Sequence, residues 1–445
     1  MKRILTVAGS DSGGGAGIQA DLKAITVLGG YGMSVITALT AQNTVGVQGV
    51  HAVPIAFIEQ QLDSVLSDIG ADAAKTGMLA TPEIVEVVAG GIKRYKVQPL
   101  VLDPVMVAKS GDSLLAEDAR ETLKKVLLPL AFVVTPNLPE AEVLCGRQVK
   151  NLNDMHEAAK RIYDLGPDNV VIKGGHLGGR AVDLLFDGVS FETLDAPRLN
   201  QRNTHGTGCT FSAALATLLA EGHQITEAVK KAKKFITRAI ATGLDIGSGH
   251  GPTNPYAHVL TWQDRESILA ELNKALDFLI HKQLGNMIPE VRSNLGYALA
   301  GALEYQEVAG FAGRISQVGD RLFAFRPAEF GASRHIARVI MAAMKHKPEL
   351  RSAMNIRFNQ DILAACQKLG LQIASFDRSQ EPKDIKEREG STLEWGTCLA
   401  LEGMKQMPDL VYDAGDVGKE PMIRILGKNP MEVVEKIGRI KAALD

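Results

Sequence analysis

Short apolar runs alternate with amphipathic stretches through the first part of the chain, and this alternation limits the folds that it can adopt. The amphipathic stretches are expected to form helices at residues 54–69, 82–95, 116–127 and 155–165. The apolar runs are expected to form strands at residues 4–8, 34–39, 73–76, 100–102, 132–135 and 170–172. Strands that alternate with helices build a largely parallel sheet covered by helices. The sequence therefore predicts an α/β fold.

A stretch rich in glycine and proline, residues 247–255, divides the chain. Such residues punctuate linkers, so we expect one domain to end near residue 260. In the remainder, strands are expected at residues 353–357, 372–376 and 410–412, and helices at 262–282, 333–346, 360–369 and 430–444. Asn429 is expected to cap the last helix. Two domains are thus predicted, one over residues 1–260 and a smaller α/β domain over residues 265–445.

Composition narrows the class of function. The formal net charge of −2 over 445 residues gives no sign of a polyanion partner, so binding of nucleic acid is not expected. No apolar run reaches the length of a membrane span, and the first residues lead into a strand rather than a secretion signal. The cysteines form no Cys-x-x-Cys pair, which disfavours a zinc ribbon or a disulfide framework. A cytoplasmic location and no membrane partner are therefore expected.

Polar residues of the first domain follow its expected strands. Gly9 opens a glycine-rich turn over residues 9–17, Asp103 follows a second strand, and Lys173 follows the last. Ligands of parallel α/β folds bind beyond the carboxyl ends of the strands. The glycine-rich turn lacks the ending of a Walker A loop and the full Gly-x-Gly-x-x-Gly spacing. On its own it is as consistent with a tight turn as with a binding loop.

The most informative segment is Thr204-His205-Gly206-Thr207-Gly208-Cys209, which opens a helical run. Free N–H groups and the helix dipole at such a turn bind anions, and the same field stabilises a thiolate. We therefore expect the N–H groups of Gly206, Thr207 and Gly208 to hold a phosphoryl group in transfer, and Cys209 to take a hydroxyl proton. A small buried hydrophobe is the alternative role for Cys209. The segment favours phosphoryl transfer.

Further residues suit nucleotide and metal binding. Asn137 and Glu140 lie three apart at an expected helix start, which places an amide and a carboxylate on one face and suits a water-coordinated Mg²⁺. A helix cap with a first-turn Glu is the alternative. Lys109 lies in a polar loop and Lys173 at a strand end, where each could reach a phosphate. A solvated turn for Lys109 and an ion-paired structural lysine for Lys173 are the alternatives.

Taken together, these motifs resemble those of the ribokinase-like superfamily, and more closely those of the hydroxymethylpyrimidine and hydroxymethylpyrimidine-phosphate kinases of thiamine biosynthesis. The resemblance covers roughly residues 1–260 and rests on residues 8–12, 14–23, 34–44, 75–79, 103–106, 109–112, 135–141 and 203–210. Most of the wider superfamily has Asp where this chain has Cys209, whereas the pyrimidine branch has Cys. The cysteine at position 209 therefore supports membership of the pyrimidine branch.

The resemblance implies a three-layer fold and two successive phosphoryl transfers from ATP with Mg²⁺, first to the pyrimidine alcohol and then to its monophosphate. It places the pyrimidine against Asp21 and Gln42, whose donor and acceptor groups suit an aminopyrimidine. Met78 and Val105 would form apolar walls. The other residues implied are Gly9 and Lys109 for the substrate, Asn137, Lys173 and Thr204 for the nucleotide, and Asp103 and Glu140 for the metal.

Two clusters in the second domain suit anions. Residues 326–335 join a turn to a helix, and residues 412–421 are followed closely by Arg424. Helix N-termini and arginines bind phosphate, although a capped helix and a plain loop are the alternatives. These clusters resemble the thiamine-phosphate synthase domain that is fused to such kinases in some prokaryotes. Further matches are residues 287–291, 294–298, 376–378, 389–392, 395–396 and 409–413.

This second resemblance implies the coupling of the pyrimidine diphosphate to thiazole phosphate, which gives thiamine phosphate and pyrophosphate. Arg314 and His335 match the pair that active members carry, so catalysis is expected. A domain that senses thiamine phosphate is the alternative. A pyridoxal-type alcohol is an alternative kinase substrate, and a homodimer is expected. The implied phosphate-binding residues are Arg326, Arg334, Lys419 and Arg424.

Overall fold

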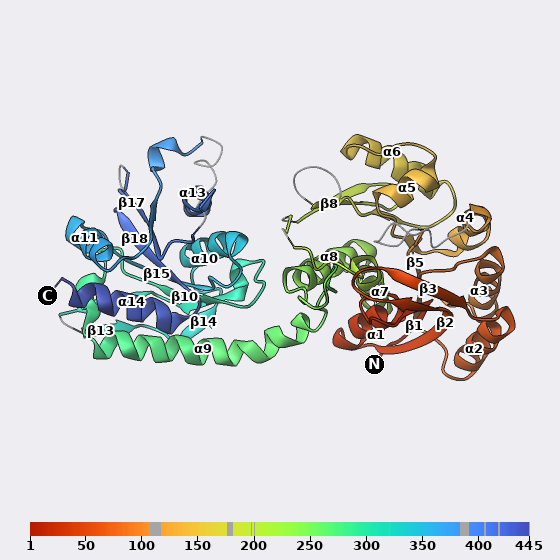
Figure 1. Ribbon diagram of the computed structural model, residues 1–445, viewed down its shortest axis with the longest axis horizontal. Helices are drawn as coiled ribbons and strands as arrows, with labels where there is room; N and C mark the ends of the chain where they lie inside the picture. Colours follow the sequence, from red (N-terminus) through yellow and green to blue (C-terminus); the bar gives the residue numbers. More distant parts are fainter. Residues whose placement is uncertain are drawn as a thin grey trace. The chain divides into compact units, whose positions relative to one another are not determined.

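The computed structural model describes residues 1–106, 117–175, 181–196, 198–199, 201–319, 321–382, 391–404, 406–416 and 419–444. The chain forms two compact units, Met1–Val259 and Leu260–Asp445 (Figure 1). Lys109, one of the predicted substrate-binding residues, lies outside the described residues. Among the helices that are described, none combines the length and the apolarity needed to cross a bilayer.

A sheet of nine strands forms the middle of the first unit, in the order β3-β2-β1-β4-β5-β6-β7-β8-β9. The strands from β2 to β7 run parallel, and antiparallel strands form both edges. The six strands predicted for this unit are present, which confirms the largely parallel sheet. The strands are β1 (Arg3–Asp11), β2 (Tyr31–Gln42), β3 (Val47–Ala52), β4 (Ala73–Thr76), β5 (Leu100–Leu102), β6 (Val133–Val134), β7 (Val170–Ile172), β8 (Ala181–Phe186) and β9 (Phe191–Ala196).

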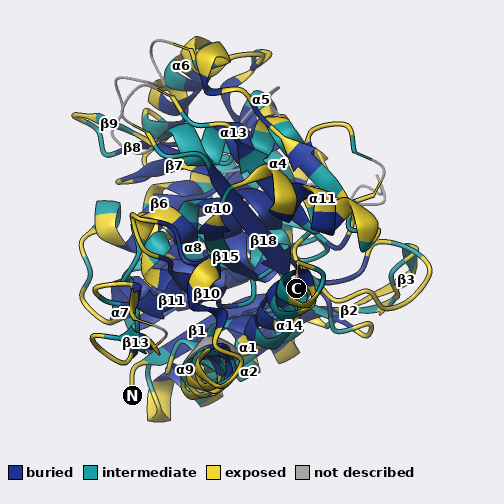
Figure 2. Ribbon diagram, turned by 90° about the vertical axis from the view of Figure 1, so that its left-hand side faces the viewer, coloured by how far each residue is buried: buried dark blue, intermediate teal, exposed yellow. Residues whose placement is uncertain are grey.

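Helices cover both faces of this sheet, because successive strand residues point to opposite faces and both sets are apolar. Leu5 and Leu100 pack with α2, α3, α5 and α6 on one face, while Ile4 and Val101 pack with α1, α7 and α8 on the other. The central strands β1, β4, β5 and β6 are buried along almost their whole length, which confirms the three-layer α/β architecture. Figure 2 shows the same burial for a central strand of the second unit, β18 (Met422–Gly427). The helices are α1 (Gly17–Val27), α2 (Ile55–Asp68), α3 (Pro82–Tyr95), α4 (Glu117–Thr122), α5 (Leu138–Cys145), α6 (Leu152–Tyr163), α7 (Thr207–Ala220) and α8 (Ile225–Ala241).

The helix predicted over residues 116–127 is divided in the structure. α4 ends at Thr122, a π-helical turn follows over Leu123–Leu127, and a 3₁₀ turn over Leu128–Leu130 ends the run. Pro129 lies in that last turn. Because proline has no N–H group and clashes with the preceding turn, a regular helix does not continue through it.

The second unit also has a sheet between two helical layers, but its strands are mostly antiparallel. Seven strands lie in the order β14-β11-β10-β15-β18-β17-β16, and β16 and β17 pair in parallel. The structure contains the three predicted strands as β15, β16 and β17, together with short strands that the sequence analysis missed. The strands are β10 (Leu295–Ala298), β11 (Val308–Phe311), β14 (Ala328–Phe330), β15 (Ser352–Arg357), β16 (Ile373–Ser375), β17 (Leu410–Asp413), β18 (Met422–Gly427), and the separate hairpin β12 (Ile315–Val318) and β13 (Arg321–Ala324).

Apolar side chains again fill both faces of this sheet. One core joins α9 (Ala257–His281), α11 (Gln360–Lys368) and α14 (Pro430–Ala442) to the strands. The other contains α10 (Arg334–His346) and α13 (Ser391–Leu401). The side chain of Asn429 accepts a hydrogen bond from the N–H of Glu432 at 2.9 Å, which confirms the predicted cap of the last helix. The prediction of a second, smaller α/β domain is likewise confirmed.

Replacing Ile437 by alanine is expected to lower the free energy of unfolding of the second unit by about 2–5 kcal/mol, because the change leaves a cavity in the core under α14. Glu435→Ala changes an exposed position of the same helix and should alter stability by less than about 0.5 kcal/mol. Urea denaturation followed by circular dichroism measures both variants. Equal effects of the two substitutions would contradict this orientation of α14.

Candidate functional sites

A cavity of about 760 Å³ lies at the carboxyl ends of the parallel strands in the first unit. Parallel strands bring their ends to one edge of a sheet, so segments far apart in the sequence meet there. The predicted residues that line the cavity are Gly9, Gln42, Met78, Asp103, Val105, Asn137, Glu140, Lys173, Thr204, Gly206, Thr207, Gly208 and Cys209.

Two glycine-rich turns contact each other at this cavity. Gly206 precedes α7 with a left-handed φ of 76°. A Cβ atom on Gly206 would lie 1.8 Å from the carbonyl oxygen of Gly15, and one on Gly15 would lie 2.4 Å from Cδ2 of His205. Both positions therefore require glycine. Of the three N–H groups predicted to hold phosphate, that of Thr207 donates to the carbonyl oxygen of Thr204 at 3.4 Å.

Asp103 and Lys173 form an ion pair beneath the start of α7. The carboxylate Oδ1 and Nζ lie 2.9 Å apart, and Thr135 also donates to Asp103. Burial raises the pKa of Asp103, but the positive charges of Lys173 and Lys75 outweigh burial and hold that pKa below its usual value. A Cβ atom on Gly208 would lie 3.3 Å from Nζ of Lys173. A permanent ion pair therefore lies beside the predicted phosphate site.

Asn137 and Glu140 form a capping box at the start of α5. The side chain of Asn137 accepts from the N–H of Glu140 at 2.9 Å, and the Glu140 carboxylate accepts from the N–H of Asn137 at 2.8 Å. Asn137 and Glu140 therefore cap the helix, which was the alternative to a metal-binding role. Both side chains also line the cavity. Burial raises the pKa of Glu140 to about 7. The negative charge of Asp103 adds to this increase, and the positive charge of Lys173 opposes it.

The carboxylates of Asp103 and Glu140 fit a magnesium ion. Mg²⁺ prefers oxygen ligands and keeps several waters when one or two protein carboxylates hold it. The negative charge of Asp103 raises the pKa of Glu140, and a cation beside both groups would relieve this repulsion. The part of the chain that the structure describes contains no group of three or more His, Cys, Asp or Glu side chains suited to a metal. A magnesium ion here would thus take most of its ligands from water or substrate.

Asp21, predicted to contact the pyrimidine, lies outside the cavity lining. Its side chain is fully buried and accepts from Nζ of Lys75 at 2.9 and 3.1 Å and from Oγ1 of Thr6 at 2.6 Å. Lys75, which sequence reasoning did not single out, does line the cavity. Burial lowers the pKa of Lys75, but the negative charges of Asp21 and Asp103 and the hydrogen bond to Asp21 act in the opposite direction, and the resulting pKa is above its usual value. Asp21 therefore holds a charged lysine at the cavity wall.

Cys209 is a partly exposed free thiol in the first turn of α7. The sequence predicts a thiolate stabilised by the helix terminus, but the surroundings of the thiol favour its protonated form. Burial raises the pKa of Cys209 to about 11, although Lys75 lowers it. The carboxylates of Asp21 and Asp103 add to the increase. The thiol is therefore protonated near neutral pH.

Asp11 and His205 lie in segments that the sequence analysis singled out, but no role was predicted for either residue. The carboxylate of Asp11 accepts from the N–H groups of Gly13, Gly15 and Ala16 at 2.8 to 3.0 Å and from Nε2 of His205 at 3.0 Å. Burial raises the pKa of Asp11, but the bonds from His205 and the backbone outweigh burial and lower it. An aspartate directly before a glycine-rich turn commonly accepts from the backbone of that turn, and this signal could have identified Asp11.

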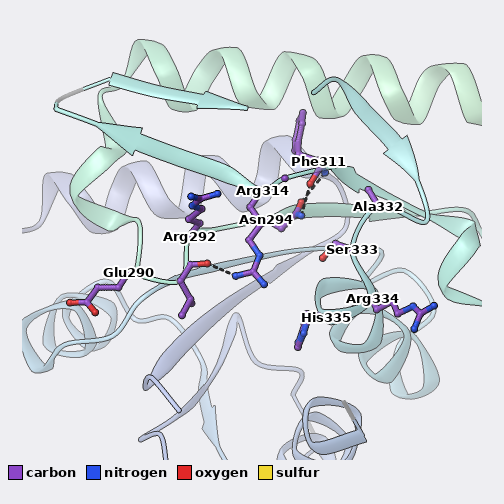
Figure 3. Close-up of a pocket in the computed structure, with 11 residues that line it drawn as sticks. Glu290, Arg292, Asn294, Phe311, Arg314, Ala332, Ser333, Arg334 and His335 are labelled. Carbon is purple, nitrogen blue, oxygen red and sulfur yellow. Dashed lines mark hydrogen bonds between the residues drawn. The ribbon is translucent and has the colours of Figure 1, made fainter. Parts of the chain in front are cut away.

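A cavity of about 420 Å³ in the second unit contains the predicted Arg314 and His335 (Figure 3). Arg314 follows β11, and His335 lies in the first turn of α10. Figure 3 shows the two side chains extending into the same space from these separate elements. The other lining residues are Glu290, Val291, Arg292, Asn294, Phe311, Gly313, Ala332, Ser333 and Arg334.

Two arginines of this cavity have unusual backbone conformations. Arg292 has a φ of 67° and Arg314 a φ of 69°, in the left-handed region that residues other than glycine rarely adopt. Such conformations cost about 1–3 kcal/mol and concentrate at functional sites. The guanidinium of Arg314 donates to the carbonyl oxygen of Val291, and the carboxylate of Glu420 accepts from the N–H groups of Glu290 and Val291. The surrounding loop therefore holds Arg314 in a fixed orientation.

His335 lies in a positively charged environment. Burial lowers the pKa of His335, and the positive charges of Arg314, Arg338, Lys419 and Arg424 lower it further. The imidazole is therefore neutral near physiological pH. A neutral imidazole can donate or accept a hydrogen bond, whereas the arginines supply the charge that an anion requires.

Of the four predicted phosphate-binding residues, Arg334 lines the cavity, whereas Arg326, Lys419 and Arg424 lie outside its lining. Arg424 is buried and pairs with Asp413 at 2.7 Å, so its guanidinium is committed to a structural partner. Arg326 lies outside the cavity lining and pairs with Glu329 at 3.4 Å on the surface. Arg334 lines the cavity and stacks on Tyr305. Lys419 is exposed outside the lining, and its charge acts on His335.

The two units match two protein families. Residues 11–254 match the family model described as phosphomethylpyrimidine kinase, and residues 271–439 match that of thiamine-phosphate synthase ThiN. The chain is 54% identical over 262 residues to the thiamine biosynthesis bifunctional protein ThiED of Geobacter sulfurreducens, covering 59% of this chain and 53% of that protein. It is 48% identical over 257 residues to the hydroxymethylpyrimidine/phosphomethylpyrimidine kinase of Bacillus subtilis, covering 57% of this chain and 95% of that protein. The chain thus spans about half the length of the first relative and nearly all of the second.

The fold of the first unit also matches a solved structure. The crystal structure of an ADP complex of Bacillus subtilis pyridoxal kinase shares 44% sequence identity with this chain and a TM-score of 0.56, covering 58% of this chain and 99% of its own. This likeness supports the predicted ribokinase-like fold. The chain therefore belongs to the phosphomethylpyrimidine kinase family, and its second unit matches the family model of thiamine-phosphate synthase ThiN.

Proposed function

We propose that the first unit transfers the γ-phosphoryl group of ATP to hydroxymethylpyrimidine and then to its monophosphate. The observation that carries this proposal is that the glycine turn before α7, Cys209 and the Asp103–Lys173 pair share one cavity. Phosphoryl transfer depends mainly on positioning and on stabilisation of charge, and these groups suit both tasks. The ADP complex of a related kinase supports a nucleotide as the phosphoryl donor.

Each end of the cavity has its own role in this proposal. The N–H groups at residues 206–208 bind the transferring phosphoryl group as negative charge develops on it. Lys173 neutralises phosphate charge, and Asn137 and Thr204 line the nucleotide side. The carboxylates of Asp103 and Glu140 would hold Mg²⁺, which would supply shielding of the phosphate charge.

The pyrimidine lies on the other side of the cavity. Gln42 contacts the ring through its amide, and Met78 and Val105 flank the ring as apolar walls. A Cβ atom on Gly9 would lie 3.3 Å from Sδ of Met78, so glycine leaves room for that wall. Cys209 takes the hydroxyl proton as the new bond to phosphorus forms.

Cys209→Ala is expected to reduce kinase turnover by about a hundredfold or more, the usual effect of removing a general base. The dissociation constant of ATP should change by less than about threefold, because the base contacts the acceptor hydroxyl. Steady-state kinetics and nucleotide titration measure these two quantities. Cys398→Ala, in the second unit, is the matched control. Turnover that survives the loss of Cys209 would remove the base role.

The raised pKa of Cys209, about 11, makes a further prediction about pH. The thiolate fraction grows about tenfold for each pH unit below that pKa, so kcat/KM should still rise between pH 7 and pH 9. This rise should disappear in Cys209→Ser, whose hydroxyl does not ionise in the range. A wild-type profile that is already flat below pH 8 would show that the thiolate of Cys209 is not the active form.

We propose further that the second unit joins the pyrimidine diphosphate to thiazole phosphate. The thiazole nitrogen forms a bond to the pyrimidine methylene carbon, and the bond from that carbon to the diphosphate oxygen breaks to release pyrophosphate. Arg314 and Arg334 supply positive charge to the leaving group. The neutral imidazole of His335 lines the same cavity and excludes water from the reacting carbon.

Arg314→Gln should leave the kinase reactions intact and slow thiamine phosphate formation by about a hundredfold or more, as expected when one charged donor to a transition state is lost. The full chain is incubated with hydroxymethylpyrimidine, ATP, Mg²⁺ and thiazole phosphate, and all products are followed by mass spectrometry. The variant should accumulate pyrimidine diphosphate, while Arg439→Gln, at an exposed position of α14, behaves as wild type. Accumulation of the diphosphate by the wild-type chain would favour a sensing role for the second unit.

Pyridoxal is a second candidate acceptor for the kinase, because the structural relative with the ADP complex is a pyridoxal kinase. Both acceptors are small aromatic rings that carry a hydroxymethyl group. Pyridoxal replaces the pyrimidine in the same mass-spectrometric assay, and formation of pyridoxal phosphate identifies this activity.

A further inference from the structure

His205 and Gln42 meet inside the kinase cavity, next to Asp11. Nε2 of His205 lies 3.0 Å from Oδ2 of Asp11 and 3.3 Å from the amide nitrogen of Gln42. The amide oxygen of Gln42 lies 3.1 Å from the hydroxyl of Thr40, and that hydroxyl also lies 3.0 Å from the carbonyl oxygen of Ser10. These contacts form one continuous chain of polar groups.

The chemistry of Asp11 fixes the proton on His205. An ionised carboxylate only accepts hydrogen bonds, and the bonds to Asp11 keep its pKa below the usual value. Nε2 of His205 must therefore carry a hydrogen and donate it to Asp11. This holds for the neutral ring and for the protonated ring alike, because both can carry a hydrogen on Nε2.

The amide of Gln42 then has one orientation that avoids a contact between two donors. With its nitrogen toward His205, two donors would face each other, and the single hydrogen of Thr40 would face two acceptors. The oxygen and nitrogen of a side-chain amide are assigned from the hydrogen-bond network. Turning the amide places its oxygen opposite the Nε2–H of His205 and its nitrogen opposite the hydroxyl of Thr40, which still donates to Ser10. No two donors then face each other, and the Nε2–H of His205 is shared between Asp11 and the oxygen of Gln42.

We infer that His205 is a positioning residue for acceptor recognition: it holds the amide oxygen of Gln42 toward itself and the amide nitrogen toward Thr40. This inference deepens the proposed function and rests on its assignment of Gln42 to the pyrimidine. With the amide fixed, one N–H group and one oxygen lone pair of Gln42 remain for the substrate. A 4-aminopyrimidine offers the matching pair, an amino donor beside a ring-nitrogen acceptor.

The surroundings of His205 make it a rigid support. The N–H of His205 donates to the carbonyl oxygen of Gly251 at 3.0 Å, and its own carbonyl oxygen accepts from the N–H of Thr253 at 3.1 Å. Its ring packs against Gly15, where a Cβ atom would lie 2.4 Å from Cδ2. The imidazole of His205 therefore has little freedom to move away from Gln42. A substrate whose aromatic ring lacks the amino group would leave part of the Gln42 amide unpaired.

Nuclear magnetic resonance of the full chain tests the orientation directly. The protein is labelled with ¹⁵N-glutamine, and the side-chain amide of Gln42 is assigned by its loss in Gln42→Glu. The inference predicts strong nuclear Overhauser effects from these amide protons to the methyl protons of Thr40. Dominant effects to the ring protons of His205 would overturn it. This measurement needs no turnover, so it decides the inference even if hydroxymethylpyrimidine is not the substrate.

Kinetics of His205→Phe test the consequence for recognition. The variant keeps an aromatic ring but loses the Nε2–H donor, so KM for hydroxymethylpyrimidine should rise about tenfold, the effect of losing one well-placed hydrogen bond. KM for ATP and kcat should change less than about threefold. His205→Gln, which restores an N–H donor, should recover most of the loss, and His223→Phe, outside the cavity lining, is the matched control.

Three results separate the explanations. A general loss of kcat and of ATP binding in His205→Phe, without rescue by His205→Gln, would mean a structural role and would overturn the inference. An unchanged KM for the acceptor would overturn it as well. A wild-type chain that phosphorylates no pyrimidine would contradict the proposed function instead, and the resonance experiment would then decide the orientation of Gln42 alone.

Discussion

The contact between the carbonyl oxygen of Gly15 and the backbone of Gly206 is the constraint on which the kinase site depends. It joins the turn after β1 to the turn before α7, so the two halves of the cavity are built against each other. Neither turn carries a complete nucleotide-binding signature by itself. Their function comes from mutual packing, which also places His205 between Asp11 and Gln42. Loss of either glycine would therefore disturb acceptor and phosphate binding together.

Sequence periodicity was sufficient to predict the parallel sheet, because a buried parallel strand is a continuous apolar run with helical stretches on either side. The residues that follow those strands, such as Gly9 and Lys173, accordingly line the cavity. The short antiparallel strands of the second unit were missed, since a strand such as Leu295–Ala298 is too short to show an alternating pattern. Resemblance to known motifs singled out Arg314, because periodicity carries no information about the role of a loop residue.

Pairing between distant side chains could not be predicted from local patterns. Asp21 has the chemistry of a substrate ligand, but Lys75 occupies its carboxylate. Arg424 has the chemistry of a phosphate ligand, but Asp413 occupies its guanidinium. The pKa of Cys209 depends on burial, which outweighs the positive charge of Lys75. In each case the residue type was informative, and the partner or the degree of burial decided what the residue does.

The two cavities handle charge in different ways. In the kinase, Lys75 and Lys173 are each paired with a carboxylate, so the attraction of Lys173 for phosphate is partly offset, and backbone N–H groups and a metal ion would add to it. In the second unit, Arg314 donates to a backbone carbonyl that carries no formal charge, and the surrounding positive charges lower the pKa of His335. A cavity with such an excess of positive charge suits a pyrophosphate leaving group, which takes electrons from the bond that breaks.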